Sequence, residues 1–196
     1  MDESPTGCWT NHHSIIEFKK QWYLFYHHND YSPKFDKARS IRLDSLSFNA
    51  DGTIQKVIPT LRGVGVTAAN KQIQIDRYTQ LSEQGISIAF LDTLNTFKGW
   101  KTIFNGAGAW LQYNSVDFGS KPLKTVTINA MSTDGAVLQL RANSITGPII
   151  AELRIAKSNE WKLTKATVLK TQTGVQNLFV VSKDGKQVEV DWISFE

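Results

Sequence analysis

The stretch AVLQLRANSITGPIIAELRI, residues 136–155, decides the fold class. It holds two short runs of alternating apolar and polar residues on either side of a turn that contains Gly and Pro, which is typical of two strands joined by a turn. No stretch of ten or more residues has the apolar spacing of an amphipathic helix. The sequence therefore predicts an all-β protein. Further strands are expected at 72–78, 86–94, 109–118, 124–132, 163–170, 176–182 and 188–195, a number and spacing that favour a β-sandwich.

The first part of the chain predicts a separate, smaller sheet. Apolar and aromatic residues alternate with polar ones over 13–18, 21–27, 39–48 and 53–58, and the turn NADG (49–52) joins the last two runs. We expect one four-stranded antiparallel sheet here. The segment PTLRGVGVTAAN (59–70) has the Pro, Gly and small residues of a linker. We therefore predict two domains, residues 1–63 and 64–196.

Composition excludes several classes of function. The chain of 196 residues is 41% hydrophobic and 20% charged with a formal net charge of +4, and its basic residues form no stripe, so nucleic-acid binding has little electrostatic support. No apolar run approaches the roughly 20 residues of a membrane helix, and the opening MDESPTG lacks the regions of a signal peptide. The single cysteine, Cys8, excludes an intrachain disulfide and a cysteine-rich zinc site. We expect a soluble chain.

Residues 72–196 resemble a family 6 carbohydrate-binding module. The resemblance is carried, in the family's order and with similar spacing, by AWLQYNSVDFGS (109–120), LQLRANSITGPIIAELRI (138–155), EWKLTKATV (160–168), GVQNLFVVSKDG (174–185) and VEVDWISF (188–195). It implies a lectin-like β-jelly-roll sandwich without catalytic function. It also implies binding to plant cell-wall polysaccharides such as xylan or other β-glucans.

A sugar site needs an exposed aromatic platform with hydrogen-bonding groups near it, because a sugar ring has an apolar face and a rim of hydroxyls. By the resemblance, Trp161 matches the tryptophan that stacks on sugar in a loop-end cleft. Trp100 and Phe104 both remain candidates for the opposing ring. Trp110 and Trp192 lie in alternating runs and are expected in the core. Glu189 stands where the family often has asparagine, and an ionised carboxylate accepts hydrogen bonds but cannot donate them, so it puts the ligand specificity of this cleft in question.

The resemblance also implies a structural calcium ion. The family's opening motif matches Ile73 to Asp76, and its closing aspartate matches Asp191, so that Gln74, Asp76 and Asp191 are the expected oxygen ligands. Gln74 is neutral and Asp76 is shorter than the glutamate of the family, which predicts a weaker site. The competing interpretation is that these are solvated polar residues at strand ends.

Residues 9–57 resemble the last blade of a family 43 glycoside hydrolase. The matching phrases are WTNHHSIIEF (9–18), QWYLFYHHND (21–30) and RSIRLDSLSFNADGTIQKV (39–57). Enzymes of that family are five-bladed β-propellers that act on xylans and arabinans, often with a family 6 module attached. By the resemblance His13, or alternatively His12, corresponds to a histidine near the central channel, where it helps to hold a metal ion or water in the intact enzyme.

The catalytic carboxylates of that family come from earlier blades. Inverting glycosidases need an acid and a base about 6.5–9.5 Å apart, and the carboxylates of this segment match no catalytic motif of the family; they are Glu17, Asp30, Asp36, Asp44 and Asp51. A free-standing metal site of the four histidines is disfavoured because adjacent residues on a strand point to opposite faces. We therefore predict that this chain alone is inactive.

Three functions remain open at this stage. The first is the carbohydrate-binding, C-terminal piece of a hydrolase of the xylosidase or arabinofuranosidase type, secreted or periplasmic by resemblance. The second is a hydrolase active only when complemented by the missing blades, and the third is a non-catalytic protein-interaction module. A lone blade exposes apolar faces and unpaired edges. We expect it to pack on the binding module, to self-associate with another copy, or to be poorly ordered.

Overall fold

The computed structural model describes residues 12–28, 39–60 and 62–196. The chain divides into two compact units, residues 1–64 and 65–196. Cys8, Asp30, Asp36 and the first three residues of the motif WTNHH lie outside the described residues. Among the residues that are described, no helix is long and apolar enough to cross a membrane.

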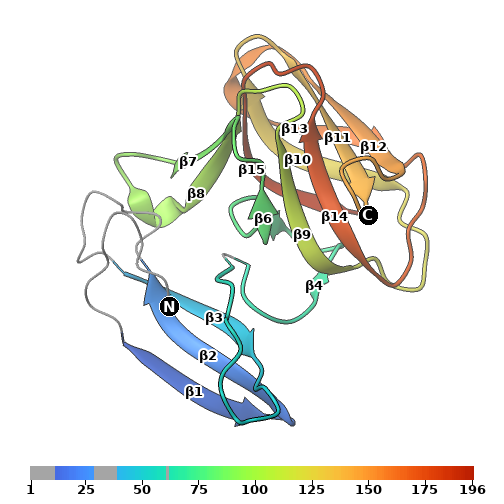
Figure 1. Cartoon of the computed structure of the whole chain (residues 1–196). Coiled ribbons are helices and arrows are strands. Elements are labelled where there is room, and N and C mark those ends of the chain that lie inside the picture. The colour runs from blue at the N-terminus through green and yellow to red at the C-terminus, as the bar shows by residue number, and fades with distance from the viewer. Residues whose placement is uncertain (1–11, 29–38, 61) are drawn as a thin grey trace. The chain divides into compact units, whose positions relative to one another are not determined.

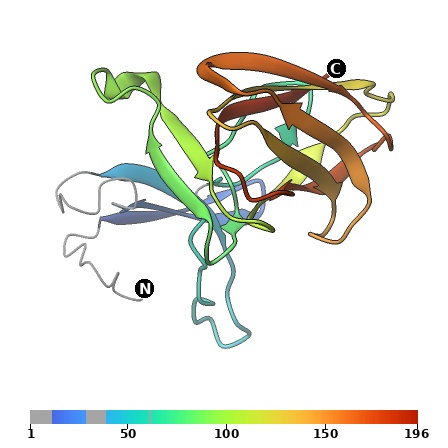
Figure 2. The same cartoon turned by 90° about the horizontal axis from the view of Figure 1, so that it is seen from above.

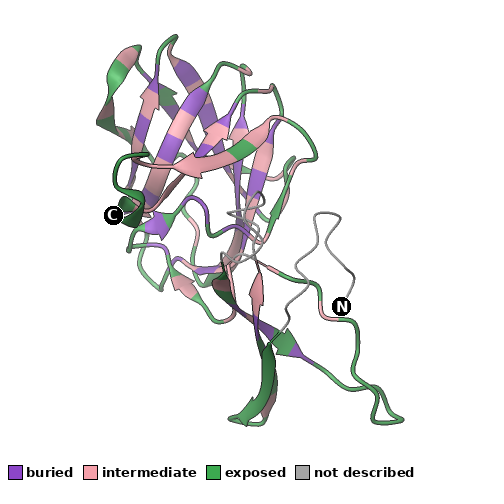
Figure 3. Cartoon of the chain, turned by 90° about the vertical axis from the view of Figure 1, so that its left-hand side faces the viewer, coloured by how far each residue is buried: buried purple, intermediate pink, exposed green. Residues whose placement is uncertain are grey.

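The first unit is built on an antiparallel sheet with the strand order β1-β2-β3 (Figure 1). Its strands are β1 (His13–Phe18), β2 (Gln21–His28) and β3 (Ser40–Leu46). One face buries Leu24, Tyr26 and Leu46, against which Val57 packs. Strand β1 is exposed along its whole length, as Figure 3 shows.

The fourth strand predicted at residues 53–58 does not form in this sheet. The segment after the NADG turn makes one isolated bridge, between Phe48 and Ile54. The turn is tight because the backbone N–H and the side-chain hydroxyl of Thr53 both donate to the Asp51 carboxylate, at 3.0 and 2.7 Å. Beyond it Val57, which is partly buried, packs against the cluster on the sheet face, and this contact replaces the edge pairing that the alternation suggested.

The second unit contains two six-stranded sheets packed face to face (Figures 1 and 2). One sheet has the order β13-β10-β15-β8-β7, with β5 paired to β15, and the other has β12-β11-β14-β9-β4, with β6 paired to β9. The bounds are β4 (Thr67–Ala68), β5 (Ile73–Gln74), β6 (Gln80–Leu81), β7 (Ile86–Phe90), β8 (Trp100–Phe104), β9 (Trp110–Asp117), β10 (Thr125–Ser132), β11 (Ala136–Ala142), β12 (Ile149–Ile155), β13 (Ser158–Thr167), β14 (Val175–Ser182) and β15 (Val188–Phe195).

The core lies between these two sheets. Buried and less buried residues alternate along the strands, as Figure 3 shows, and Leu111, Ile128, Leu138, Leu178 and Ile193 are among the fully buried side chains. This is the arrangement that period-two alternation predicts. Strand β8 was not predicted. Its first residues follow the turn-like sequence FKG, and only its last residues, through Phe104, have a clear alternation of burial.

Candidate functional site

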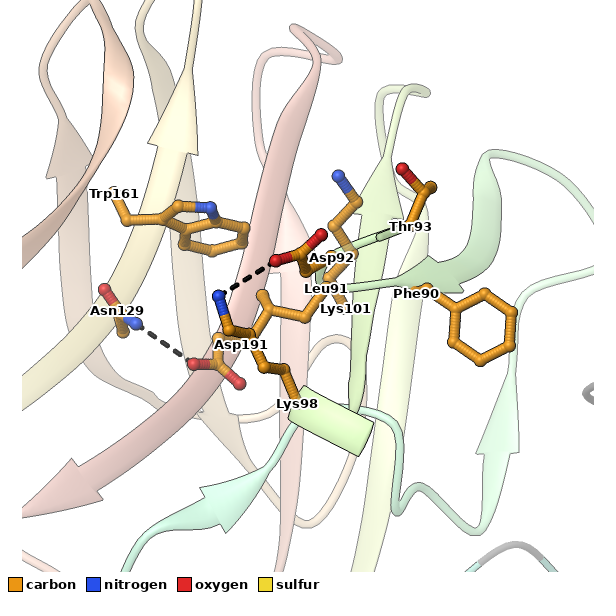
Figure 4. Close-up of a pocket in the computed structure, with 9 residues that line it drawn as sticks. All are labelled: Phe90, Leu91, Asp92, Thr93, Lys98, Lys101, Asn129, Trp161 and Asp191. Atoms are coloured by element: carbon orange, nitrogen blue, oxygen red, sulfur yellow. Dashed lines mark hydrogen bonds and ion pairs between the residues drawn. The ribbon is translucent and has the colours of Figure 1, made fainter. Parts of the chain in front are cut away.

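A pocket of about 460 Å³ lies on the outer face of the sheet that contains β13, β10, β15, β8 and β7 (Figure 4). Each of these five strands contributes at least one residue, and the loop between β7 and β8 contributes the rest. The lining residues are Phe90, Leu91, Asp92, Thr93, Lys98, Lys101, Asn129, Trp161 and Asp191. The sequence prediction had named two of them, Trp161 for sugar and Asp191 for calcium.

Trp161 provides the aromatic wall of the pocket. It lies in β13, which is the last strand of its sheet, and its side chain is half-buried. Ser158 pairs with Ser132 and Lys162 with Ala130, so Trp161 falls between these pairs, at an irregularity of the ladder. Its predicted position in a loop-end cleft stays a prediction. In Figure 4 the indole points toward Lys98, Asp92 and Asp191, whereas the ring of Phe90 turns away from it.

The opposite wall is the connection between β7 and β8, which is fixed by its own hydrogen bonds. The Asp92 carboxylate accepts from the backbone N–H of Leu94 at 2.8 Å and pairs with the Lys98 ammonium at 2.9 Å. A short 3-10 helix, Thr96–Lys98, carries Lys98, and the Asn95 side chain caps it. Hydrogen bonding, first of all by Lys98, lowers the pKa of Asp92. The wall is thus a preformed polar surface.

Asp191 forms the floor together with Asn129. The pairing of β10 with β15 is irregular here: Asn129 lies opposite Trp192 and Ala130 lies opposite Val190, so that Asp191 has no partner in the ladder. This is a β-bulge, a feature that commonly redirects side chains next to binding sites. The Asn129 amide donates to the Asp191 carboxylate at 3.0 Å. Burial raises the pKa of Asp191, and this hydrogen bond opposes the rise.

Glu189 is not free to contact sugar from this sheet face. Its carboxylate lies 2.7 Å from the ammonium of Lys101, and both side chains are largely covered. The pair bridges β15 and β8, where Glu189 is opposite Ile103 in the ladder. The residue that replaces the family's asparagine is therefore neutralised by a lysine two positions away on the neighbouring strand.

The two candidates for the opposing aromatic ring are both displaced from the pocket. Phe104 is 0% exposed and belongs to the core, because it lies at the buried end of β8. The prediction of Phe104 as a sugar contact is thus wrong. Trp100 begins β8 and stacks on Phe90 with 4.1 Å between ring centroids. Adjacent residues of a strand point to opposite faces, so Trp100 lies on the face of the β7–β8 hairpin opposite to that of Lys101. Trp100 is not among the residues that line the pocket.

Both strand tryptophans expected in the core, Trp110 and Trp192, are only partly buried. Trp110 packs against Phe179, with 5.7 Å between ring centroids. Trp192 lies beside the bulged Asp191, which turns it outward. The bulge therefore explains why alternation failed at Trp192.

The predicted calcium ligands lie on neighbouring segments: β5 pairs with β15, and the backbone N–H of Ile75, between Gln74 and Asp76, donates to the Asp191 carbonyl oxygen at 2.9 Å. Gln74 is exposed on β5 and lies opposite Trp192. Asp76 is 3% exposed, and its carboxylate is 3.5 Å from the Arg77 guanidinium. A cation would have to compete with Arg77 for Asp76, whereas Asn129 donates only to the Oδ2 oxygen of Asp191 and does not occupy its Oδ1 oxygen. Calcium binding stays a prediction.

In the first unit, His13 is exposed and lies opposite Tyr26 in the sheet. The backbone N–H of His12 donates to the His27 ring at 3.4 Å. Within the described parts of the chain, no group of three or more His, Cys, Asp or Glu side chains could hold a metal ion. The proposed channel role of His13 in an intact enzyme stays a prediction.

Several residues of the pocket were missed by sequence reasoning. Asn129 had a usable signal, because it is a polar residue at an outward position in the alternating run TINAMS. Asp92, Lys98 and Lys101 had none, since their relevance depends on which strands are neighbours. Together the lining offers one aromatic face, an amide and several charged groups. That combination suits a ligand with an apolar face and many hydroxyls.

Comparison with known proteins gives the family. Residues 79–196 match the model of carbohydrate-binding module family 6. The chain belongs to this family. Its second unit is a family 6 module with a jelly-roll-like sandwich fold, and carbohydrate binding is the function that this membership supports.

Relatives of the family 6 chain extend the match to both units. An arabinoxylan arabinofuranohydrolase of Paenibacillus polymyxa is 26% identical over 189 residues, which cover 87% of this chain and 28% of the relative. The crystal structure of a glycoside hydrolase family 43 arabinoxylan arabinofuranohydrolase from Bacillus subtilis, in complex with cellotetraose, aligns with 95% of this chain and 40% of its own (TM-score 0.67, 24% identity).

A single family 6 module from Clostridium cellulolyticum, in complex with xylose, aligns with 66% of this chain and 99% of its own (TM-score 0.59, 24% identity). At these identities the structures show the fold alone. The family 6 chain spans less than half the length of the arabinofuranohydrolases that it matches.

Proposed function

We propose that the family 6 module binds a xylan-type polysaccharide of the plant cell wall in the pocket beneath Trp161. The observation that carries this proposal is the joint presence of Trp161, Asn129 and Asp191 in one pocket of about 460 Å³. The indole offers an apolar surface for the C–H face of a sugar ring, and the amide and carboxylate offer partners for its hydroxyls. The names of the related enzymes, arabinoxylan arabinofuranohydrolases, support the choice of polysaccharide.

The binding module serves, in this proposal, to hold a hydrolase on arabinoxylan outside the cytoplasm. The alignment with arabinoxylan arabinofuranohydrolases along both units supports the link to a hydrolase. None of the described carboxylates is assigned a catalytic role, so hydrolysis belongs to parts that the intact enzyme would provide. We expect no hydrolysis of aryl xylosides or arabinofuranosides by the present chain.

Removal of the indole tests the binding site. We expect Trp161→Ala to lose retention on soluble arabinoxylan in affinity electrophoresis, because one stacked ring is worth about 1 kcal/mol beyond burial. A wild-type affinity of roughly 10 µM to 1 mM is expected, since ordering costs offset much of the contact energy. The change in melting temperature should be small because β13 is an edge strand.

A matched control is Trp22→Ala, which removes a tryptophan of 36% exposure from the other unit. This variant should be retained like the wild type, which separates site-specific binding from general adsorption of aromatic rings. If Trp161→Ala remains folded and is retained as strongly as the wild type, the pocket is not the arabinoxylan site. The binding function would then belong to another surface of the module.

A further inference from the structure

The geometry of the bulge assigns Asp191 to the pocket. A ladder residue of β15 would be held by its cross-strand partner, but Asp191 is the one left over between Val190 and Trp192. Its carboxylate reaches the pocket floor, where Asn129 donates to one of the two oxygens, Oδ2. In Figure 4 this carboxylate lies below the indole of Trp161.

Charge pairing singles out Asp191 among the acidic groups of the site. Lys101 is paired with Glu189 at 2.7 Å, and Lys98 is paired with Asp92 at 2.9 Å. Among the residues that the structure describes, no lysine or arginine nitrogen lies within ion-pair distance of Asp191. The two lysines of the pocket are thus neutralised, and the pocket retains the negative charge of Asp191 alone.

The half-buried carboxylate of Asp191 can accept hydrogen bonds from the donors of a ligand in the pocket. An ionised carboxylate has about four acceptor sites, and Asn129 uses one of them. Two neighbouring hydroxyls of a sugar can donate to such a group, and hydrogen bonds to a charged acceptor are roughly twice as strong as neutral ones. A carboxylate on the ligand would instead meet a like charge in a partly desolvated site.

We propose that Asp191 anchors the hydroxyls of a neutral sugar and makes the pocket reject sugars that carry a carboxylate, such as uronic acids. This inference rests on the proposed function, because it takes the pocket to be the sugar site. It gives Asp191 a role different from the calcium ligand that its sequence motif predicted. Trp161 supplies stacking to any sugar ring, whereas Asp191 supplies the discrimination between neutral and acidic rings.

The test compares Asp191→Asn and Asp191→Ala with the wild type. Binding is measured by titration calorimetry with a linear xylo-oligosaccharide and with one that carries a glucuronic acid branch, in buffer with EDTA. We expect Asp191→Ala to lose at least about tenfold in affinity for the neutral ligand. Asp191→Asn should lose less, but it should narrow the preference for the neutral over the acidic ligand by about tenfold. Asp134→Asn, in the exposed β10–β11 turn, is the control for the same chemical change and should leave both affinities unchanged.

The outcomes separate this inference from the function on which it rests. If Trp161→Ala abolishes binding while both Asp191 variants keep the affinities and the preference of the wild type, the role of Asp191 is overturned and the pocket stands. If Trp161→Ala binds normally, the pocket itself is wrong. Thermal unfolding with added calcium tests whether Asp191 is a calcium ligand instead. The inference would also be overturned if calcium raised the melting temperature of the wild type but not of the two Asp191 variants, and if these variants kept the sugar affinity of the wild type. Asp191→Asn keeps the size of the side chain, so its affinities for the neutral and the acidic ligand still test the inference if the alanine variant does not fold.

Discussion

Asp44 is expected to hold the end of the first unit onto its sheet. Its carboxylate is 5% exposed and accepts three hydrogen bonds: from the Tyr26 hydroxyl at 2.6 Å, from the Thr60 backbone N–H at 3.1 Å and from the Thr60 hydroxyl at 2.6 Å. The Thr60 hydroxyl in turn accepts from the backbone N–H of Gly63 at 3.2 Å. One carboxylate therefore connects β2, β3 and the segment that leads toward the second unit.

The cost of Asp44→Ala can be estimated from these contacts. Each net hydrogen bond contributes about 1 kcal/mol, and a donor left buried without a partner costs about 1–3 kcal/mol. Asp44→Ala removes three hydrogen bonds to a buried carboxylate, and bonds to a charged group contribute more than neutral ones, so we expect a loss of roughly 3–5 kcal/mol. Single-domain stabilities are about 5–15 kcal/mol, so the change should open much of this small unit. Tyr26→Phe removes one donor and should cost only about 1 kcal/mol.

Hydrogen exchange followed by mass spectrometry is the suitable assay, because it reports each unit separately. Asp44→Ala should strongly reduce the protection of β2, whereas the hairpin of β11 and β12 in the second unit serves as internal reference. Tyr26→Phe should reduce it slightly. Unchanged protection of β2 in Asp44→Ala would show that burial of Leu24 and Leu46 alone holds the segment, and the argument from hydrogen bonds would have to be abandoned.

Two further predictions concern the stability of the second unit. Hydrogen bonds from Lys183 and Gln139 lower the pKa of Glu152. Its pKa in the folded state therefore lies below the unfolded value of about 4.3, so ionised Glu152 stabilises the fold at pH values above about 4.3. This contribution is lost as the pH falls through the folded pKa. Glu152→Gln should lower the melting temperature at pH 7 but not at about pH 2.5, and equal melting curves at pH 7 would refute this. Gly147→Ala would place a Cβ atom in hard contact with the Ala142 carbonyl oxygen, so we expect a loss of about 2–3 kcal/mol. The loss is measured by thermal unfolding against the wild type and against Gly119→Ala, whose Cβ meets open space and which incurs only the strain of a positive φ (72°), about 1 kcal/mol. A Gly147→Ala protein as stable as Gly119→Ala would contradict the clash.

The sequence predicted the fold well wherever a strand alternates over seven or more residues. Strands β10 and β11 are examples, because their apolar residues mark the core side without knowledge of their neighbours. Prediction failed where tertiary contacts override the local pattern. Residues 53–58 alternate, but Val57 packs against the cluster on the sheet face, and β8 pairs with β7 and β15 despite a weak pattern of its own.

The site was harder to predict than the fold. Trp161 and Asp191 could be singled out from motifs, but their meeting in one pocket depends on the strand order β13-β10-β15, which brings residues 129, 161 and 191 side by side. A bulge cannot be recognised from the sequence pattern, because the extra residue only interrupts the alternation of apolar and polar residues, as many other features do. The outward turn of Asp191 and Trp192 could therefore not be predicted.

The bulge at Asp191 also bears on how the module could change its ligand. Most side chains in a sheet are constrained by a partner across the ladder, so an exchange there disturbs pairing as well as surface chemistry. Asp191 has no such partner, and its main-chain carbonyl already accepts a hydrogen bond from the N–H of Ile75 at 2.9 Å whatever side chain is present. Position 191 is thus a place where selection, or an engineer, can alter the polarity of the pocket floor while the surrounding strands keep their register.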